Sequence, residues 1–382
     1  MKRPGRAGRH VRQPNGYRAF IPEPLPPRPG IQFDEELQTL LSKADRALGR
    51  LDGSIQTLPD PDLFVFMYVR KEAVLSSQIE GTQASLHDVL NAEAKILDPS
   101  RPGDVNEVLN YIEAMNYGMD RLKSLPVSIR LIREIHERLV AGVRGQFQQP
   151  GEIRTSQNWI GPQGCTLADA TFVPPSPGTV MECLGALEKF LHADVSMPVL
   201  IKIGLAHAQF ETIHPFLDGN GRIGRLLITF LLCEKDILQT PLLYLSVFFK
   251  RHRMAYYDLL QNTRDNGDFE SWLKFFLRGL AETSNAATAT ARLIVALREE
   301  HRNVILEHLG RRSGNAIALL ETLFRSPTIN INGAARQLGI SYANANHLVA
   351  ELVSLGILRE VTGQARNRVF YYRPYIDLFD DI

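Results

Sequence analysis

The sequence of 382 residues holds 43 Lys or Arg against 42 Asp or Glu, which gives a formal net charge of +1. This balance provides no global electrostatic field that would favour nucleic acid or an anionic membrane. Hydrophobic residues make up 44% and charged residues 22%, as in ordinary globular proteins, and no uninterrupted apolar run approaches the length of a membrane span. The length suits two or three domains with a sizeable core.

Cysteine usage and the first residues bear on location. Cys165, Cys183 and Cys233 are widely spaced and form no C-x-x-C pair, which predicts reduced thiols in a cytoplasmic protein. The basic start of the chain leads into prolines rather than an apolar segment, which predicts no secretory signal.

Residues 1–32 are punctuated by Pro and Gly, and six Lys or Arg precede the first acidic residue, Glu23. We expect an extended or disordered basic arm. A solvated tail is favoured over a nucleic-acid-binding arm, although the prolines would also let the segment lie extended on the folded body.

Residues 33–104 are predicted to form an N-terminal helical region. Helical patterns run from about Asp34 to Leu51 and from Pro61 to Leu75. The second continues as SSQIEGTQASL, where Ser76 and Glu80 are four residues apart and therefore share one helix face. Taken alone, this stretch is compatible with an amphipathic helix that carries a solvated glutamate.

The same stretch contains helix-end signals. Gly81 suits the position just after a helix, where a left-handed backbone is common. Thr82 or Ser85 is suited to cap the next helix, and Asp88 stands three residues after Ser85.

Residues 105–283 are predicted to be a helical core. Two helices are expected between Val105 and Val143, with His136 as a packing residue. Residues 144–175 are rich in Gly, Pro, Gln and Ser, and their short β-prone pieces EIRTSQNWI and TFVPP predict a hairpin or flap with a loop. Three further helices are expected over Val180–His192, Val199–Ile213 and Arg222–Leu238.

The chemistry-bearing stretch of this region is HPFLDGNGRIGR, residues 214–225. Gly219, Asn220 and Gly221 can adopt backbone angles that let several N–H groups converge on one point. A helix that begins near Gly221 would add its free N–H groups and the positive end of its dipole, which together make an anion cradle.

Side chains in this stretch suit phosphate chemistry. Arg222 and Arg225 are three residues apart and would lie on one helix face, where both can pair with phosphate oxygens. Asp218 could hold a magnesium ion that bridges those phosphates. His214 is the candidate base for an incoming hydroxyl.

Other phosphate and metal motifs fit less well. GNGRIG formally matches the dinucleotide fingerprint, but the preceding residues have helical spacing instead of a strand pattern. No GK[ST] follows, so the stretch is not a Walker A loop. His207 and His214 are seven residues apart, about 10 Å along a helix, which disfavours joint ligation of one zinc ion.

HPFLDGNGRIGR resembles the signature of the Fic family, H-P-F-x-D/E-G-N-G-R-x-x-R, at every defined position. The resemblance implies a mostly helical protein that transfers AMP from ATP to a protein hydroxyl, with the target possibly being the protein itself. It implies His214 as base and Asp218 as magnesium ligand. The phosphate-binding residues that it implies are Gly219, Asn220, Gly221, Arg222 and Arg225, with Arg225 on the γ-phosphate.

The segment upstream resembles the Fic inhibitory motif, [S/T]-x-x-x-E-[G/N], at Ser76, Glu80 and Gly81. By this resemblance Glu80 pairs with Arg225, repels the incoming triphosphate and keeps the enzyme mostly off. In a reaction that removes AMP, Glu80 could instead orient water.

The resemblance also suggests two contact regions. A Fic flap aligns the target by strand addition, which points to Trp159 and Ile160, although a plain loop with a packed tryptophan fits these residues equally well. His252 stands where related proteins often carry an adenine-contacting Asn, so His252 and Tyr256 are the candidates for base contact.

Residues 284–312 are predicted as a linker helix and residues 313–382 as a winged helix-turn-helix unit. Three helical pieces precede two strand-like pieces, and residues 341–354 would be the recognition helix. Its exposed positions hold no Arg or Lys, whereas the wing carries arginines, so DNA and a protein are both open as partners. The wing arginines are Arg359, Arg366, Arg368 and Arg373.

The predicted fold class is therefore all-α, a Fic helical core with a small β-hairpin flap and a C-terminal winged helix-turn-helix. The predicted function is an autoinhibited protein adenylyltransferase that uses Mg·ATP. The alternatives are other Fic-type chemistry, such as removal of AMP or transfer of another phosphate-containing group, and a DNA-binding regulator that senses nucleotide. The resemblance implies a possible homodimer, and no membrane partner is expected.

Overall fold

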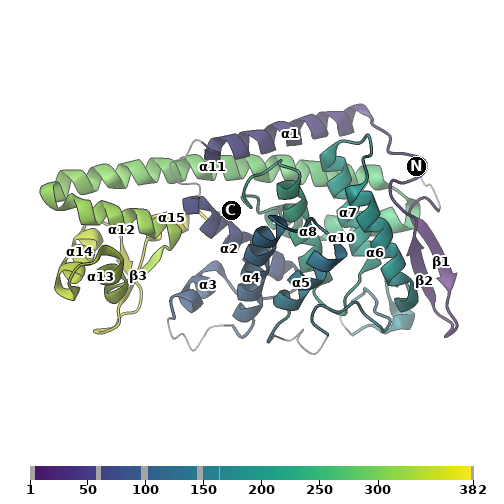
Figure 1. The fold of residues 1–382 in the computed structure, drawn as a ribbon, viewed down its shortest axis with the longest axis horizontal. Helices are drawn as coiled ribbons and strands as arrows, with labels where there is room; N and C mark the ends of the chain where they lie inside the picture. Colours follow the sequence, from purple (N-terminus) through teal and green to yellow (C-terminus); the bar gives the residue numbers. More distant parts are fainter. Residues whose placement is uncertain (1–4, 57–61, 96–101, 144–148, 163, 380–382) are drawn as a thin grey trace.

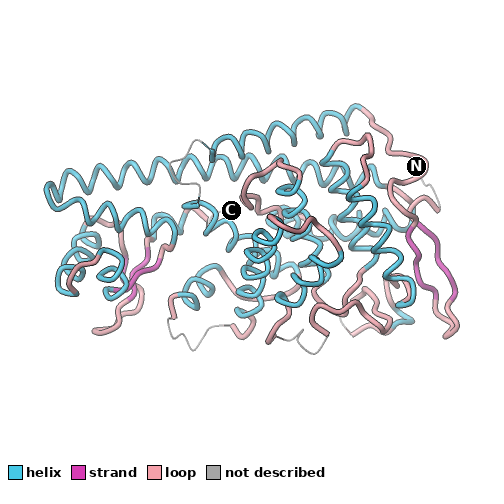
Figure 2. Tube along the Cα trace, in the orientation of Figure 1, coloured by secondary structure: helices cyan, strands magenta, loops and turns pink. Residues whose placement is uncertain are grey.

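The computed structural model describes residues 5–56, 62–95, 102–143, 149–162 and 164–379. The described chain is mostly helical, with two small antiparallel sheets at opposite ends of the elongated molecule (Figures 1 and 2). The predicted mostly helical fold class is confirmed.

Two long helices run side by side along one edge of the molecule (Figure 1). They are α1, Glu35–Gln56, and α11, Phe269–Leu309. The predicted boundary between a core ending at residue 283 and a linker helix beginning at 284 falls inside α11, whose 41 residues are continuous. The helix continues because no proline interrupts it and because Ser284, Ala287 and Ala291 keep a buried face in register.

Helices packed beside this pair form the core that carries the loop at residues 214–219. Helix α7 has the predicted bounds, whereas α8 begins two residues earlier than predicted, at Asn220, and ends at Glu234 instead of Leu238. Helices α7 and α8 pack against each other, so the loop between them is held at both ends. The core helices are α4 Val105–Leu122, α5 Ile129–Leu139, α6 Pro177–His192, α7 Val199–Ile213, α8 Asn220–Glu234, α9 Ser246–Arg251 and α10 Arg253–Asn266.

The helix-end signals of the N-terminal region are confirmed. Helix α2, Asp62–Ile79, ends just before Gly81, whose φ of 99° lies in the left-handed region. Helix α3, Leu86–Glu93, starts with a capping box in which Ser85 and Asp88 satisfy each other's backbone N–H groups. The chain therefore leaves α2 sharply at Glu80.

The predicted solvated arm is wrong for the described part of residues 1–32, which includes a β-hairpin. Strand β1, Gly8–Arg12, pairs antiparallel with β2, Arg18–Pro22, and Phe20 is buried. Gly16, with a φ of 90°, lies in the turn. The Asn15–Gly16 dipeptide is a hairpin signal that the density of prolines and arginines outweighed in the prediction.

Arg6 fastens this hairpin to the start of α11. Its guanidinium, 1% exposed, donates to both carboxylate oxygens of Glu270 at 2.7 and 2.9 Å. It also donates to the carbonyl oxygens of Gly267, Pro29 and Gly30, each at 2.8 Å. This buried, fully paired arginine holds the N-terminal segment on the core.

We expect Arg6→Ala to release the hairpin. Loss of one partner of a buried ion pair costs about 3–5 kcal/mol, because the other charge is left uncompensated. Amide hydrogen exchange in β1 and β2 should accelerate by roughly 100-fold or more. Arg9→Ala is the control, since Arg9 is exposed and lies 3.8 Å from Glu23. Equal protection in Arg6→Ala and wild type would contradict this anchoring.

The predicted strands of the flap are wrong for the residues that the structure describes there. Residues 144–148 and 163 lie outside the described residues. Among the described residues from 149 to 175, the only β-pairing is an antiparallel bridge between Ile160 and Phe172. A short 3-10 turn, Leu167–Asp169, lies between them. The prolines Pro174 and Pro175 donate no ladder hydrogen bonds, and polar side chains from the core tie the segment down instead.

A compact unit forms the C-terminal end, with the predicted order of three helices followed by two wing strands. It also has a strand that the sequence did not predict, β3, so that its sheet has the antiparallel order β3-β5-β4. The short turn η3, Gly310–Arg312, joins it to α11. Its elements are α12 Ser313–Arg325, β3 Thr328–Asn330, α13 Ile331–Leu338, α14 Tyr342–Ser354, β4 Arg359–Glu360, β5 Val369–Tyr371 and α15 Arg373–Asp377.

This C-terminal unit packs on α2. The Lys71 ammonium donates to the carbonyl oxygen of Phe379, and the ring of Tyr68 meets that of Phe379 edge-on at 5.3 Å. Helix α2 therefore contacts the C-terminal unit through α12 and contacts Arg225 of α8 with its last turn.

None of the described helices is long and apolar enough to cross a membrane. Cys165, Cys183 and Cys233 are free thiols.

Candidate active site

A strained loop joins α7 to α8. His214 ends α7 with φ 49° and ψ 61°, a left-handed conformation that is uncommon for a residue other than glycine, and Gly219 precedes α8 with a φ of 78°. The Asn220 side chain closes the loop by bonding to both the N–H and the C=O of Phe216 at 2.8 Å. Asn220 is thus a structural staple through its side chain, and only its backbone N–H can serve a phosphate.

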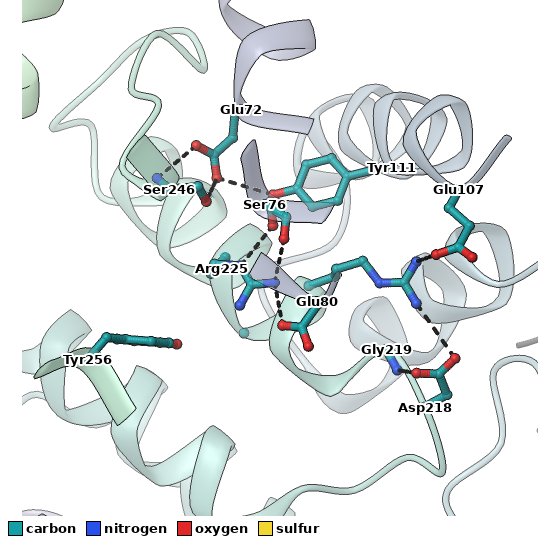
Figure 3. A network of polar contacts seen from close by, with 12 residues as sticks. Glu72, Ser76, Glu80, Glu107, Tyr111, Asp218, Gly219, Arg225, Ser246 and Tyr256 are labelled. Carbon is teal, nitrogen blue, oxygen red and sulfur yellow. Dashed lines mark hydrogen bonds and ion pairs between the residues drawn. The ribbon is translucent and has the colours of Figure 1, made fainter. Parts of the chain in front are cut away.

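The predicted anion cradle has the right backbone. No side chain caps the N-terminus of α8, so its first N–H groups are left for a ligand. Arg225, on the second turn of α8, joins this uncapped helix end to Ser76 in the last turn of α2 (Figure 3). The position suits a negatively charged group.

Two residues that the sequence analysis missed hold the backbone of His214. The buried Arg154 guanidinium donates to the His214 carbonyl at 2.9 Å, and Asn158 donates to the same oxygen at 3.2 Å and to the Phe216 carbonyl at 2.8 Å. Burial lowers the pKa of Arg154 to about 10, which leaves it charged at neutral pH. These contacts stabilise the strained His214 conformation. Neither residue stands in a recognisable motif.

His136 supports the other side of the loop. Its Nδ1 accepts the Gly151 N–H at 2.9 Å, so its Nε2 carries the proton that it donates to the Asp218 carbonyl at 3.1 Å. The ring stacks on Phe216 with centroids 3.7 Å apart. Burial lowers the pKa of His136 to about 4, and the residue packs the loop as predicted.

The His214 side chain is poised to accept a proton. Its Nδ1 is buried and has no hydrogen-bond partner among the described residues. Burial, with Arg264 and Arg154 nearby, lowers the pKa of His214 to about 3. The imidazole is therefore neutral at physiological pH, which is the form that a general base requires.

Tyr256 lies in the core and not on an open surface. It is 1% exposed, and its hydroxyl donates to His207 Nε2 at 2.9 Å, while His207 Nδ1 donates to the Gly224 carbonyl. Tyr256 is predicted to contact the nucleobase, but its side chain is buried and already hydrogen-bonded within the protein. Its neighbour Tyr257 is 37% exposed, and His252 is exposed with its ring 4.6 Å from that of Phe248. Of the three residues, Tyr257 and His252 are the exposed ones.

Arg222 is buried and paired within the protein. One of its nitrogens donates to Glu107 at 3.3 Å and another lies 3.7 Å from the Asp218 carboxylate. Glu107, on α4, is a further residue that the sequence analysis missed, because 115 residues separate it from Arg222.

Arg225 is held by the last turn of α2 (Figure 3). Its Nε donates to the Ser76 hydroxyl at 2.8 Å, and its Nη2 donates to the Ser76 carbonyl at 3.0 Å and to Glu80 at 2.7 Å. The Arg225 side chain is 2% exposed and that of Glu80 is 33% exposed. Burial by itself would raise the pKa of Glu80, but Arg225 overrides it and holds this pKa below its usual value.

Glu80 also lies directly against the start of α8. A Cβ added at Gly221 would fall 2.3 Å from Glu80 Oε1 and 3.0 Å from Arg225 Nη1. Only glycine at position 221 therefore permits this close approach. The carboxylate of Glu80 stands at the mouth of the predicted anion cradle.

A second carboxylate anchors the same helix. Glu72, two turns before Glu80, accepts from the Ser246 N–H at 3.0 Å, the Ser246 hydroxyl at 2.5 Å and the Tyr111 hydroxyl at 3.4 Å. Burial raises the pKa of Glu72 to about 7, against the opposing effects of Ser246 and Arg225. Glu72 lay beyond the motif considered in the sequence analysis, yet it fixes α2 to α4 and α9.

Asp218 is the residue suited to hold a magnesium ion. One of its carboxylate oxygens accepts the Gly219 N–H at 2.7 Å, and its side chain is 36% exposed. The described residues contain no cluster of three or more metal-ligating side chains. This donor set fits magnesium, which takes one or two carboxylates and fills its remaining positions with phosphate oxygens and water.

The two predicted target-contact residues lie at the surface next to the loop. Trp159 is 40% exposed, and its indole N–H donates to the Cys165 carbonyl at 3.0 Å. Ile160 forms the bridge to Phe172. Trp159 directly follows Asn158, which contacts the His214 carbonyl, and Ile160 comes next.

Comparison with known proteins finds two Fic/DOC family models that match parts of this chain. Residues 38–120 match the Fic/DOC family N-terminal model, and residues 126–232 match the Fic/DOC family model. The chain therefore carries both Fic domains, and the resemblance seen in residues 214–225 is confirmed.

Curated relatives are named protein adenylyltransferase Fic. The Culex quinquefasciatus protein is 31% identical over 203 residues, which cover 52% of this chain and 37% of that relative. The Drosophila yakuba protein is 28% identical over 251 residues, covering 63% of this chain and 46% of the relative. The chain thus matches less than half the length of each.

Solved structures share the fold. A Fic family protein from Desulfovibrio desulfuricans G20 aligns with a TM-score of 0.57 and 17% identity, over 89% of this chain and 97% of that protein. A Fic domain containing signaling protein from Bacteroides thetaiotaomicron aligns with a TM-score of 0.50 and 17% identity, over 68% of this chain and 97% of that protein.

Proposed function

We propose that this protein is an autoinhibited protein adenylyltransferase, which transfers AMP from Mg·ATP to a hydroxyl of a protein target or of the protein itself. The observation that carries the proposal is the juxtaposition of a neutral, half-buried histidine with an uncapped helix N-terminus and Arg225. The names of the curated relatives support the same chemistry.

In this reaction the target hydroxyl gives its proton to the His214 imidazole. The hydroxyl oxygen attacks the α-phosphate of ATP, and the bond from that phosphorus to the pyrophosphate oxygen breaks. Arg154 and Asn158 keep His214 oriented through its carbonyl. The N–H groups at the start of α8 meet the charge that develops on the α-phosphate.

The remaining phosphates need cations. Arg225 is the side chain suited to the γ-phosphate, once Glu80 has left it. A magnesium ion held by Asp218 would neutralise phosphate charge. Arg222, paired with Glu107 and Asp218, would keep the Asp218 carboxylate in place.

The proposed brake is the Glu80–Arg225 pair. Glu80 both engages Arg225 and places a negative charge beside Gly221, where phosphates would enter. Tight packing of α2 through Glu72 and Ser76 keeps that carboxylate in position. ATP phosphates and the Glu80 carboxylate would compete for one site.

The origin of the transferred group tests the reaction. Glu80→Gly protein is incubated with magnesium, a soluble protein extract and ATP that carries its label on either the α- or the γ-phosphate. We expect protein-bound label from the α-phosphate alone. Label from the γ-phosphate would show phosphoryl transfer instead. Loss of AMP from adenylylated proteins, with no gain, would favour AMP removal with Glu80 orienting water.

We also propose that residues 313–382 form a winged helix-turn-helix that binds DNA. Support comes from the exposed side chains of α14, with Tyr342 57% exposed, and from the exposed wing arginines Arg359 and Arg366. Arg368 joins the wing to α14 by donating to Asn346 at 2.7 Å. The cytoplasmic location is supported by the free thiols.

This second role predicts salt-sensitive DNA binding that survives His214→Ala. Reversal of the two exposed charges, in Arg359→Glu with Arg366→Glu, should weaken binding and reduce the slope of log affinity against log salt by about 2. Lys43→Glu with Arg46→Glu, exposed on α1, is the matched control. Affinity and slope measured by anisotropy that do not change in the wing variant would exclude the wing as a DNA contact.

A further inference from the structure

A groove runs between the N-terminal hairpin and the segment that follows Arg154. One part, of about 870 Å³, is lined by residues that include Tyr17, Gln157 and Trp159. A second part, of about 390 Å³, is lined by residues that include His10 and Arg18. The two parts share Tyr17, Leu167 and Ala168 and therefore adjoin each other.

The two walls of this groove are bonded together. The Tyr17 hydroxyl donates to Gln157 at 3.0 Å, and the Phe20 N–H donates to the Val173 carbonyl at 2.9 Å. The ring of Phe20 packs on that of Phe172 at 5.6 Å. The hairpin is thus bonded to the segment that carries the Ile160–Phe172 bridge, and these bonds fix the two walls of the groove relative to each other.

The segment that lines the groove is hydrogen-bonded to the loop that carries His214. Asn158 donates to the His214 carbonyl, and Trp159, the next residue, lines the groove. The indole N–H is already engaged by the Cys165 carbonyl, while 40% of the side chain stays exposed. A chain lying in the groove would therefore lie beside the segment that contacts the His214 backbone.

Basic residues lie at the other part of the groove: His10 and Arg18 line it, and Arg12 lies beside Arg18. His10, Arg12 and Arg18 are exposed and lie on one face of the hairpin, because Arg12 is paired directly with Arg18 and His10 is two residues from Arg12. Like charges directly opposite each other in an antiparallel pair are destabilising. No ion pair joins either arginine to a residue that the structure describes. Asp169, which follows the groove-lining Ala168 in the chain, accepts a hydrogen bond from the Thr166 hydroxyl.

We propose that this groove docks an acidic segment of the protein target, with His10, Arg12 and Arg18 binding its carboxylates and with the residue to be modified lying beside Trp159. This inference rests on the proposed adenylyl transfer and names the class of target. A polypeptide is favoured over nucleic acid because the proposed reaction needs a side-chain hydroxyl, which a polypeptide supplies.

The test is binding of a fluorescein-labelled peptide, Glu-Asp-Glu-Glu-Ser-Tyr-Gly-Gly, to the full chain without nucleotide. We expect the Arg12→Glu with Arg18→Glu variant to bind roughly tenfold more weakly or worse, since two attractive contacts become repulsive. Arg12→Gln with Arg18→Gln, which removes the two charges but keeps polar side chains, should show a smaller loss. Arg292→Glu with Arg302→Glu, exposed on α11, is the control for net charge and should bind as wild type does.

Three results would overturn the docking surface. They are equal binding by the hairpin variants, equal binding of a peptide with lysine in place of each acid, and displacement of the acidic peptide by a short oligothymidylate at lower concentration than by unlabelled peptide. AMP transfer is measured separately in each variant in the Glu80→Gly background. Intact peptide binding without any AMP transfer would leave the groove standing and remove the proposed reaction, whereas the converse would remove the groove alone.

Discussion

Glu80→Gly is expected to raise the rate of AMP incorporation by roughly 10- to 100-fold over wild type at the same Mg·ATP concentration. Hydrogen bonds to charged groups contribute about 1.5–3 kcal/mol each, and the Glu80–Arg225 contact at 2.7 Å must be given up before Arg225 can hold a phosphate. The substitution also clears the carboxylate from beside Gly221. Initial rates of α-label incorporation measure the effect.

Gln83→Gly is a matched control for this prediction. Gln83 lies in the same turn, and its side chain donates to the Gly81 carbonyl, so its loss loosens the turn without releasing Arg225. We expect at most a small change in rate. Adding Arg225→Ala to Glu80→Gly should abolish the gain. Equal rates for wild type and Glu80→Gly at saturating Mg·ATP would remove Glu80 from the inhibitory role.

His214→Ala, made in the Glu80→Gly background, is expected to lower AMP transfer by about 10²- to 10⁴-fold, the usual contribution of a positioned general base. Affinity for Mg·ATP should change little, because the cradle is built from backbone N–H groups and arginines. Label incorporation and calorimetric ATP titration separate the two effects.

His192→Ala controls for loss of a histidine, since His192 is exposed at the end of α6. It should transfer AMP at the parental rate. Transfer that persists in His214→Ala would exclude His214 as the base. A parallel collapse of ATP binding would instead show that His214 holds the loop, as its left-handed backbone and its contacts from Arg154 would allow.

Local features were within reach of the sequence because each depends on residues close together in the chain. The turn at Gly81, the Ser85–Asp88 capping box and the left-handed Gly219 before α8 all follow from a few neighbouring side chains. The candidate site was visible for the same reason, since His214, Asp218 and Arg225 fall within twelve residues.

Local signals also misled where several competed. The prolines and arginines of residues 1–32 outweighed the Asn15–Gly16 turn, and the β-prone pieces around Trp159 form only one described bridge. Tyr256 is a predicted nucleobase contact, yet it lies in the core against His207. Helix packing, which no short sequence pattern encodes, decides which face of α10 is buried.

The sequence by itself determined the helical class and the cradle motif. Through the Fic resemblance it also implied the pairing of Glu80 with Arg225. Only the tertiary structure decided what surrounds them: Glu107 on Arg222, Glu72 on Ser246, Arg154 on His214 and Arg6 on Glu270. Between 60 and 264 residues separate the partners of these contacts. A single polar residue has no periodicity, so its partner is fixed only when packing of the apolar helix faces brings distant segments together.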